Sequence, residues 1–123
     1  MFMEKQIDKQ AYTFGRYTKA DRWGSYFYQL KETLTLSPES ILEIGVGEGV
    51  FRDYIKWHTS ISYQSLDIAD DLSPDVLGSV TNIPLKDSSF DMVCAFEVLE
   101  HLPFEHFEKA VSELFRVSKK YVI

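Results

Sequence analysis

The sequence contains a single cysteine, Cys94, among its 123 residues. One thiol can form neither an intrachain disulfide nor a metal site built from several thiolates, so we expect a cytoplasmic protein in a reducing compartment. No apolar run approaches the ~20 residues that a membrane-spanning helix needs. The first ten residues also lack the apolar centre of a signal peptide.

Basic side chains are scarce relative to acidic ones: 13 Lys and Arg stand against 19 Asp and Glu, which gives a formal net charge of −6. Broad binding to nucleic acid or to an anionic membrane needs an excess of Lys and Arg, so we expect no nucleic acid and no membrane partner. The sequence also has no internal repeat, low-complexity segment or long block of charge.

What the sequence does contain is typical of one soluble globular domain. Apolar residues make up 45% of the chain and charged residues 26%. A chain of this length can bury a core without disulfides. We therefore predict a single domain over residues 1–123, divided into an N-terminal helical segment, 1–36, and a core, 37–123.

A helix is predicted between Asp21, which suits an N-cap or a first turn, and the Ser37-Pro38 pair, because proline disfavours helical backbone in the residue before it. Its apolar residues recur at helical spacing and are expected to face a core: Trp23, Tyr26, Phe27, Leu30 and Leu34. The aromatic stretch before this helix, residues 11–19, is expected to pack on the domain surface.

After Pro38, short apolar runs alternate with helical patterns. Strands are predicted at 41–44, 62–68, 75–80 and 90–96 and from 121 onward, with helices from Val50 and from Pro103 to about Val117. The stripe of the last helix that is expected to face the core is Phe104, Phe107, Val111, Leu114 and Phe115. This alternation predicts an α/β fold with a parallel sheet. The link 69–74 is too short for a helix, so we expect a loop or single turn there and irregular pairing of the third strand.

The first strand leads into a glycine turn that precedes a helix, with glycines at Gly45, Gly47 and Gly49. Glycine permits positive φ and lets a ligand approach the backbone without meeting a Cβ, while the helix N-terminus behind the turn offers free N–H groups. The pattern G-x-G-x-G differs from the G-x-G-x-x-G of dinucleotide sites, whose third glycine would fall on Val50. No Gly-Lys-Ser/Thr follows, which excludes a P-loop.

Asp67 ends the second strand, about 20 residues beyond the glycine turn. In doubly wound sheets an acid at this place accepts hydrogen bonds from a ribose diol, although an ordinary turn aspartate would look the same. Together, the glycine turn and Asp67 favour a ligand containing a nucleoside, bound at the carboxyl ends of the first two strands.

Three segments, LEIGVGEG, SLDI and GSVTNIPLKDSSFDMVCAFEVLEHLP, resemble in this order class I S-adenosylmethionine-dependent methyltransferases, in particular their type-11 branch. The resemblance covers about residues 40–123. It implies a Rossmann-like sheet of about five strands in the order 3-2-1-4-5 with flanking helices. It also implies S-adenosyl-L-methionine as cofactor, S-adenosyl-L-homocysteine as product, and transfer of the methyl group to an acceptor, which we expect to be a small molecule.

The same resemblance implies which residues bind the cofactor. The methionine portion would be held by the first strand's end and the backbone of the glycine turn: Glu43, Gly45, Val46, Gly47 and Gly49. Asp67 would accept hydrogen bonds from the ribose hydroxyls.

The acids Glu43 and Glu48 would repel a pyrophosphate but suit a ligand that carries ammonium and sulfonium groups, which favours the methyl donor over NAD.

The resemblance extends to the adenine and the methyl group of the cofactor. Ile68 would lie against the adenine face, Ser79 and Val80 would reach its edge, and Phe96 would border the methionine end. At Ser79 the sequence departs from the family, many members of which carry an aspartate there. A serine hydroxyl can still accept a hydrogen bond, but it is neutral and shorter.

His101 is the candidate catalytic residue, because imidazole titrates near neutrality and can act as a general base. A role in organising the loop after the fourth strand is the alternative. Glu97 and Glu100 lie close to it in the sequence, which raises the question of a metal site. His106 follows five residues after His101, a poor match to one helix face, and we predict no metal.

Two further acidic or reactive positions are expected to be structural. Asp91 begins the fourth strand, at the end of the sheet away from bound ligands, and Cys94 in the middle of that strand suits a small core residue. The aromatic residues Tyr12, Phe14 and Tyr17 would either line an acceptor pocket or pack on the core.

Two other functions remain open: a non-catalytic module that binds S-adenosylmethionine or serves only as structure, and an NAD-dependent oxidoreductase, against which Val50 counts. The chain stops within the fifth strand, before the antiparallel hairpin that usually follows it in the family, so we expect a C-terminally truncated domain whose own activity is open. An unpaired fifth strand predicts either a homo-oligomer through that edge or marginal stability.

Overall fold

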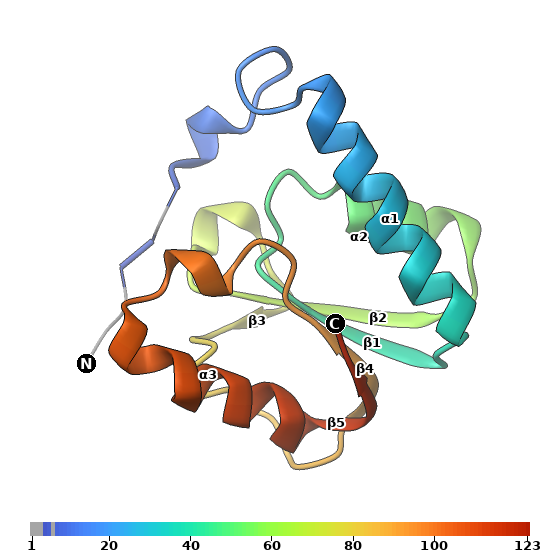
Figure 1. Ribbon diagram of the computed structural model, residues 1–123, viewed down its shortest axis with the longest axis vertical. Helices are drawn as coiled ribbons and strands as arrows, with labels where there is room; N and C mark the ends of the chain where they lie inside the picture. Colours follow the sequence, from blue (N-terminus) through green and yellow to red (C-terminus); the bar gives the residue numbers. More distant parts are fainter. Residues whose placement is uncertain (1–3, 6) are drawn as a thin grey trace.

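Five parallel strands form one sheet in the order β3-β2-β1-β4-β5, as predicted (Figure 1). The strands are β1 (Ser40–Ile44), β2 (Ser62–Asp67), β3 (Val76–Leu77), β4 (Phe90–Cys94) and β5 (Ser118–Val122). The computed structural model describes residues 4–5 and 7–123; of the predicted N-terminal segment, residues 1–3 and 6 lie outside the described residues. Both β1 and β4 are buried over nearly their whole length, which explains their continuous apolar sequences.

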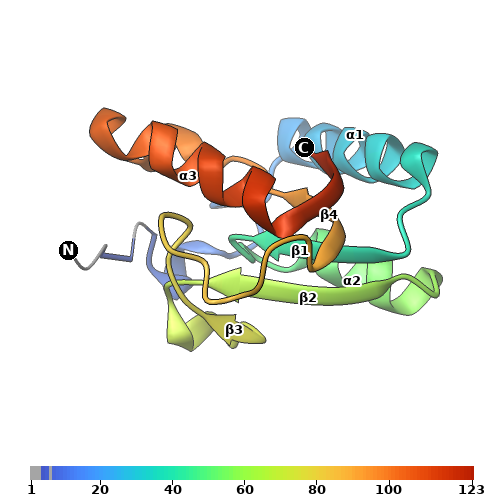
Figure 2. The same ribbon diagram turned by 90° about the horizontal axis from the view of Figure 1, so that it is seen from below.

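Helices cover both faces of this sheet. With three short 3₁₀-helices, they are η1 (Lys9–Ala11), α1 (Ala20–Leu36), α2 (Val50–His58), η2 (Asp70–Leu72), η3 (Leu99–His101) and α3 (Phe104–Val117). Leu114 and Val117 of α3 belong to the core on one face, while Phe51 and Ile55 of α2 belong to the core on the other (Figure 2). Within residues 4–5 and 7–123, no helix has both the length and the apolar character needed to cross a bilayer.

The predicted apolar stripe of α1 is buried only towards its C-terminal end. Leu30 and Leu34 pack on the core beneath α2, and Tyr26 is half-buried. Trp23 and Phe27 are 50% and 61% exposed, so the prediction is wrong for these two residues. The N-terminal half of α1 extends beyond the strands, where no sheet lies beneath it (Figure 1).

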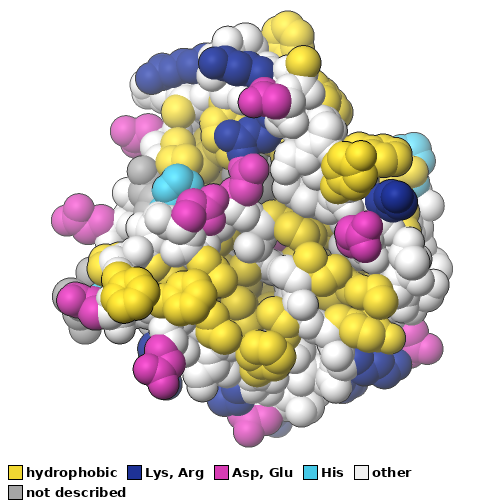
Figure 3. All heavy atoms as spheres, viewed as in Figure 1, with side chains coloured by type: hydrophobic (Ala, Val, Ile, Leu, Met, Phe, Trp, Pro, Cys, Tyr) yellow, Lys and Arg dark blue, Asp and Glu magenta, His cyan; other side chains and the backbone are white. Residues whose placement is uncertain are grey.

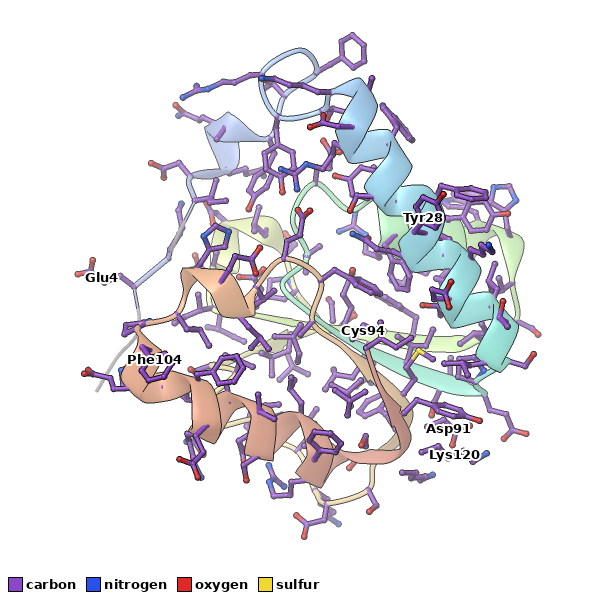
Figure 4. The ribbon with its side chains drawn as sticks, viewed as in Figure 1. Glu4, Tyr28, Asp91, Cys94, Phe104 and Lys120 are labelled. Atoms are coloured by element: carbon purple, nitrogen blue, oxygen red, sulfur yellow. The ribbon has the colours of Figure 1, made fainter. Side chains whose placement is uncertain are left out.

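The predicted stripe of α3 is wrong for its three phenylalanines. The helix buries a different set of residues at helical spacing, which is Ala110, Glu113, Leu114 and Val117. Phe104, Phe107 and Phe115 are 92%, 45% and 64% exposed, and Phe104 lies on the outer side of the helix in Figure 4. The hydrophobic pattern does not identify the buried face of α3, because a glutamate, Glu113, occupies one of the buried positions.

The remaining boundaries are close to the predicted ones. The link after β2 is the single turn η2, as predicted, and Asp21 lies in the first turn of α1, whose N-cap is Lys19. β3 is only two residues long instead of 75–80, because the chain turns away after Leu77 and closes an isolated bridge between Ser79 and Asn82.

β5 is an outer strand, so one of its backbone edges faces away from the sheet (Figure 1). The N–H of Ile123 donates to the Val93 carbonyl (3.1 Å), and the Ala95 N–H donates to the Ile123 carbonyl (2.8 Å). Alternate residues of a strand present their backbone groups to opposite sides, so Val122 faces outward. The prediction stays that the chain either pairs through this edge or is marginally stable, and pairing would appear as a monomer–dimer equilibrium in sedimentation velocity at rising concentration.

Val122→Pro is the matched variant for this edge, because it removes an outward N–H that makes no bond within the sheet. We expect the variant to keep its circular dichroism spectrum and to sediment as a monomer. Wild-type protein that remains monomeric at several hundred micromolar would rule out pairing through β5.

Candidate functional site

A pocket lies at the carboxyl ends of β1, β2 and β4, where the loops that follow these strands meet. The pocket is partly open to solvent and has a cavity volume of about 100 Å³. Eight of the residues predicted to bind the cofactor or to act in catalysis line it: Gly45, Gly47, Asp67, Ile68, Ser79, Val80, Phe96 and His101. Three others that the resemblance implied, Glu43, Val46 and Gly49, do not line the pocket.

The glycine turn forms one wall of this pocket, and its three glycines all have positive φ, of 79° at Gly45, 56° at Gly47 and 86° at Gly49. A Cβ on Gly45 would lie 2.6 Å from Cγ2 of Val98, which is closer than real Cβ atoms come to another atom. The turn therefore requires glycine at Gly45 for two reasons, its backbone angle and the approach of the loop after β4.

Asp67 connects the glycine turn to the end of β2. Its Oδ2 accepts a hydrogen bond from the Val46 N–H (2.9 Å), and its Oδ1 accepts one from the Ala69 N–H (2.9 Å). A carboxylate can accept about four hydrogen bonds, so each oxygen of Asp67 retains a lone pair for a ligand in the pocket. The role of Val46 is thus indirect, because its backbone orients Asp67.

Glu43 lies beneath the turn rather than in the pocket. Its side chain is 3% exposed, and its Oε1 accepts a hydrogen bond from the Tyr63 hydroxyl (2.5 Å). Burial raises the pKa of the Glu43 carboxyl to about 8, against the opposing effects of the Tyr63 hydrogen bond and the charge of Arg52. The structure thus gives Glu43 a place in the core between β1, β2 and α2.

The raised pKa of Glu43 predicts a pH dependence of stability. Between its unfolded pKa of 4.5 and its folded pKa of about 8, only the folded chain keeps this proton. Stability therefore falls as pH rises through this window, by up to about 1.4 kcal/mol per pH unit. Glu43→Gln keeps an oxygen for Tyr63 and is expected to flatten this slope, as measured by urea unfolding between about pH 5 and pH 8. Equal slopes in variant and wild type would contradict the protonation of Glu43.

The side of the pocket next to β2 and β3 carries one polar group among apolar ones. Oγ of Ser79 accepts a hydrogen bond from the Thr81 N–H (3.2 Å) and lies 2.8 Å from Oγ1 of Thr81. Ile68 and Val80 line the pocket beside it, and Val80 is otherwise buried in the core. The backbone after β3 therefore holds the Ser79 hydroxyl at an apolar wall.

The N-terminal arm, residues 7–19, contributes Ile7, Tyr12 and Tyr17 to the lining of the pocket. Tyr12 and Tyr17 line the pocket with their rings edge to face, 4.6 Å apart between centroids, whereas Phe14 is 89% exposed. Burial raises the pKa of Tyr12 to about 12, so its hydroxyl stays neutral. Sequence reasoning left open whether these aromatic residues pack on the core or line a pocket, and two of the three line one.

Polar contacts hold this arm and α1 against the core. Glu48 of the glycine turn accepts hydrogen bonds from the hydroxyls of Thr18 and of Tyr26, the latter at 2.5 Å. Nζ of Lys5, just ahead of the arm, lies 2.7 Å from Oδ2 of Asp71 in η2. Sequence reasoning missed Lys5 and Ile7 as lining residues, since neither belongs to a pattern.

Glu97 and His101 line the pocket on the side of β4. Glu97 has a φ of 54°, in the left-handed region that residues other than glycine rarely adopt. Its carboxylate forms an ion pair with Arg22 of α1 and lies 3.4 Å from the Ser25 hydroxyl, which donates to it. Nε2 of His101 lies 3.9 Å from Oε1 of Glu100. A carboxylate and an imidazole are thus available at the strand end where an acceptor would approach.

Asp91 and Cys94 lie away from the pocket, as predicted. Oδ2 of Asp91 accepts a hydrogen bond from the Glu39 N–H (2.9 Å) and lies 3.6 Å from Nζ of Lys120, and Figure 4 shows the two side chains together at the far end of β4. The Glu39 N–H and the two lysines of β5 lower the pKa of Asp91. Cys94 is fully buried in the core, and burial raises its pKa.

The comparison with known proteins identifies the family. The sequence model of a family described as "Methyltransferase domain" matches residues 42–121, which include the end of β1, the glycine turn, Asp67, and the segment from Glu97 to His101. The chain belongs to this methyltransferase family. No curated protein matches the chain.

Solved structures share the fold of this methyltransferase domain. A SAM-dependent methyltransferase from Thermotoga maritima, described as a possible histamine N-methyltransferase, is 30% identical over 81% of this chain and 52% of that one, with a TM-score of 0.56. A SAM-dependent methyltransferase from Archaeoglobus fulgidus is 21% identical over 84% and 51%, with a TM-score of 0.67. The cyclase SpnF is 17% identical over 81% and 42%, with a TM-score of 0.65. The chain thus spans about half the length of these proteins.

The pocket of this methyltransferase domain fits the family's cofactor, S-adenosyl-L-methionine. The turn has glycine at Gly45, where a Cβ would meet the loop after β4. Asp67 can still accept hydrogen bonds from a ligand at the end of β2. Apolar side chains line the pocket next to Asp67. The acids Asp67 and Glu97 face a pocket whose only described Lys or Arg is Lys5. In the described part of the chain, no three His, Cys, Asp or Glu side chains cluster closely enough to hold a metal ion.

Proposed function

We propose that the pocket binds S-adenosyl-L-methionine and that the protein transfers its methyl group to a small-molecule acceptor. The observation that carries the proposal is Asp67, whose two carboxylate oxygens bind the glycine turn and the backbone after β2 while a lone pair on each remains available. This arrangement supports recognition of a ribose diol at the carboxyl ends of β1 and β2.

The remaining lining residues divide between the other parts of the cofactor. Ile68, Ser79 and Val80 lie beside Asp67 and suit the adenine, with the Ser79 hydroxyl as the polar group at its edge. Gly45 and Gly47 offer backbone without side chains to the methionine portion. Glu43 does not reach the pocket, so we assign the methionine portion to the backbone of the turn alone.

The bound cofactor supplies a methyl group that is already activated by its sulfonium centre. The chain therefore needs to bind, orient and exclude water more than to activate a bond. Tyr12 and Tyr17 would cover the mouth, and Phe96 would form an apolar wall next to Glu97. His101 is the candidate general base, required only for an acceptor that must lose a proton.

A dinucleotide cofactor fits these residues less well. α2 begins at Val50, directly after Gly49, so the third glycine of a dinucleotide site is missing from the helix start. Glu48 at the turn would also repel a pyrophosphate. The non-catalytic alternative lacks methyl transfer, and a module that serves only as structure would lack cofactor binding as well.

Calorimetry with S-adenosyl-L-homocysteine tests the proposal directly, and thermal shift provides a second readout. We expect saturable binding with one site per chain, and weaker or undetectable binding of NAD⁺. Transfer of a radiolabelled methyl group to a pool of small-molecule acceptors then separates the enzyme from a non-catalytic module. The proposal would be abandoned if neither S-adenosyl-L-methionine nor S-adenosyl-L-homocysteine changed heat or melting temperature.

A further inference from the structure

A second hollow adjoins the cofactor pocket, between the start of α1 and the loop after β4. The two share Tyr17 and Glu97, so a ligand in the second hollow would meet the first at these side chains. Its other lining residues are all polar or charged: Arg16, Lys19, Asp21, Arg22 and Ser25. This composition contrasts with the cofactor pocket, which has Ile, Leu, Val and Phe among its lining residues.

Glu97 is held firmly at the boundary between the two hollows. Its left-handed backbone is unfavourable for a residue other than glycine, so the surrounding contacts must offset this strain. Arg22 forms an ion pair with its carboxylate, Ser25 donates a hydrogen bond to it, and the Arg22 guanidinium lies 4.2 Å from the centroid of the Tyr17 ring. Arg22 therefore positions both residues that the hollows share.

The other charged residues of this second hollow are unevenly paired. Asp21 accepts a hydrogen bond from the Arg22 N–H (2.9 Å) in the first turn of α1, a place that favours a negative charge. Arg16 and Lys19 are exposed, and the described residues offer neither of them an ion pair. Figure 3 shows Lys and Arg side chains gathered at this end of the molecule, with acidic side chains and a histidine below them.

We infer that this second hollow is the acceptor site and that it takes a small zwitterion of the amino-acid type; the inference rests on the proposed function. The acceptor's carboxylate would bind Arg16 and Lys19 at the rim. Its amino group would lie at Glu97, which faces the cofactor pocket and can accept a hydrogen bond from an N–H. An acceptor without a carboxylate would leave the two basic side chains unpaired.

Three matched probes test this assignment: histidine, its decarboxylated form histamine, and its deaminated form imidazolepropionate. Each is titrated into the full chain saturated with S-adenosyl-L-homocysteine, and affinity is measured by calorimetry. We expect histidine to bind about tenfold more tightly than either probe that lacks one charged group, since each loses a charge-assisted contact. Histamine that binds as tightly as histidine would overturn the inference, as would the absence of binding by both.

Variants test which side chains of the protein contact the carboxylate and the amino group of histidine. Arg16→Gln combined with Lys19→Gln is expected to reduce histidine affinity to that of histamine, while histamine itself is unaffected. Glu97→Gln is expected to weaken histidine and histamine but not imidazolepropionate. Lys31→Gln, an exposed lysine further along α1, is the matched control and should change nothing.

The two proposals fail in different ways. If S-adenosyl-L-homocysteine does not bind the wild-type chain, the proposed function is wrong and the acceptor site falls with it. If it binds and the double variant leaves histidine affinity unchanged, the function stands and the acceptor assignment is wrong. Affinity for S-adenosyl-L-homocysteine is measured in every variant, so that a misfolded variant is recognised.

Discussion

Asp67→Asn is expected to weaken binding of S-adenosyl-L-homocysteine by about 100-fold, because hydrogen bonds from a diol to a carboxylate are charge-assisted. The variant also disturbs the turn. An amide has one acceptor oxygen, whereas Asp67 accepts from both the Val46 and the Ala69 N–H. The NH₂ group of the asparagine would face one of these donors, so the wall that carries Gly45 and Gly47 would lose its anchor.

Asp75→Asn is the matched control for this experiment. Oδ2 of Asp75 accepts hydrogen bonds from the N–H (2.9 Å) and the hydroxyl (3.1 Å) of Ser65, so it also joins two backbone segments beside β2. It does not line the pocket. We expect both variants to lose stability in urea but only Asp67→Asn to lose ligand affinity. Similar affinities in the two variants would show that Asp67 acts on the fold and not on the cofactor.

The sheet could be predicted from the sequence because its signals are local and redundant. Short apolar runs, two of them followed directly by glycine, alternate with helical patterns along the chain, which is enough to predict a parallel α/β fold. The strand order came from the family resemblance, and the structure confirms it. The helix faces could not be predicted equally well, because several stripes at the same spacing compete for burial on α3.

The candidate site was predictable where it lies on a strand end and not where it depends on distant contacts. Gly45 follows β1 and Asp67 ends β2, and parallel strands bring such positions to one edge. Glu43 precedes the same turn by two residues, yet the alternation of side chains along β1 directs it to the core and to Tyr63. Arg22 and Glu97 are 75 residues apart in sequence, and no spacing predicts their ion pair.

The Glu113–Arg116 pair of α3 is another contact that sequence spacing alone would place on the surface. Glu113 is 5% exposed; its Oε1 accepts from Nε of Arg116 (2.8 Å), and its Oε2 from Nη2 (2.9 Å) and from the Ile83 N–H (2.8 Å). Arg116 also donates to the carbonyls of Ile83 and Leu85 (2.9 Å each). This network fixes the segment between β3 and β4 to α3, and the Arg116 hydrogen bonds lower the pKa of Glu113.

Arg116→Met is therefore expected to lower the free energy of unfolding strongly, because it removes the closer of the two cations beside the buried Glu113 carboxylate and leaves only Lys109, whose Nζ lies 4.0 Å from Oε1. Glu113→Gln separates this charge effect from loss of packing, since glutamine keeps an oxygen for the Ile83 N–H. On its own, Glu113→Gln should lower the urea midpoint; added to Arg116→Met, it should raise it.

This reversal of sign distinguishes a buried charge from an ordinary surface ion pair. Arg52→Met, measured near pH 6 where the nearby Glu43 carboxyl is protonated in the folded chain, removes the pairing of Arg52 with the exposed Asp53 and should cost less than about 1 kcal/mol. Acidification should also stabilise Arg116→Met relative to wild type, because the Glu113 carboxyl can then take up a proton instead of remaining charged in the core. If Glu113→Gln lowered the midpoint equally in both backgrounds, the carboxylate would be solvated, and the network would act only through the carbonyls that Arg116 binds.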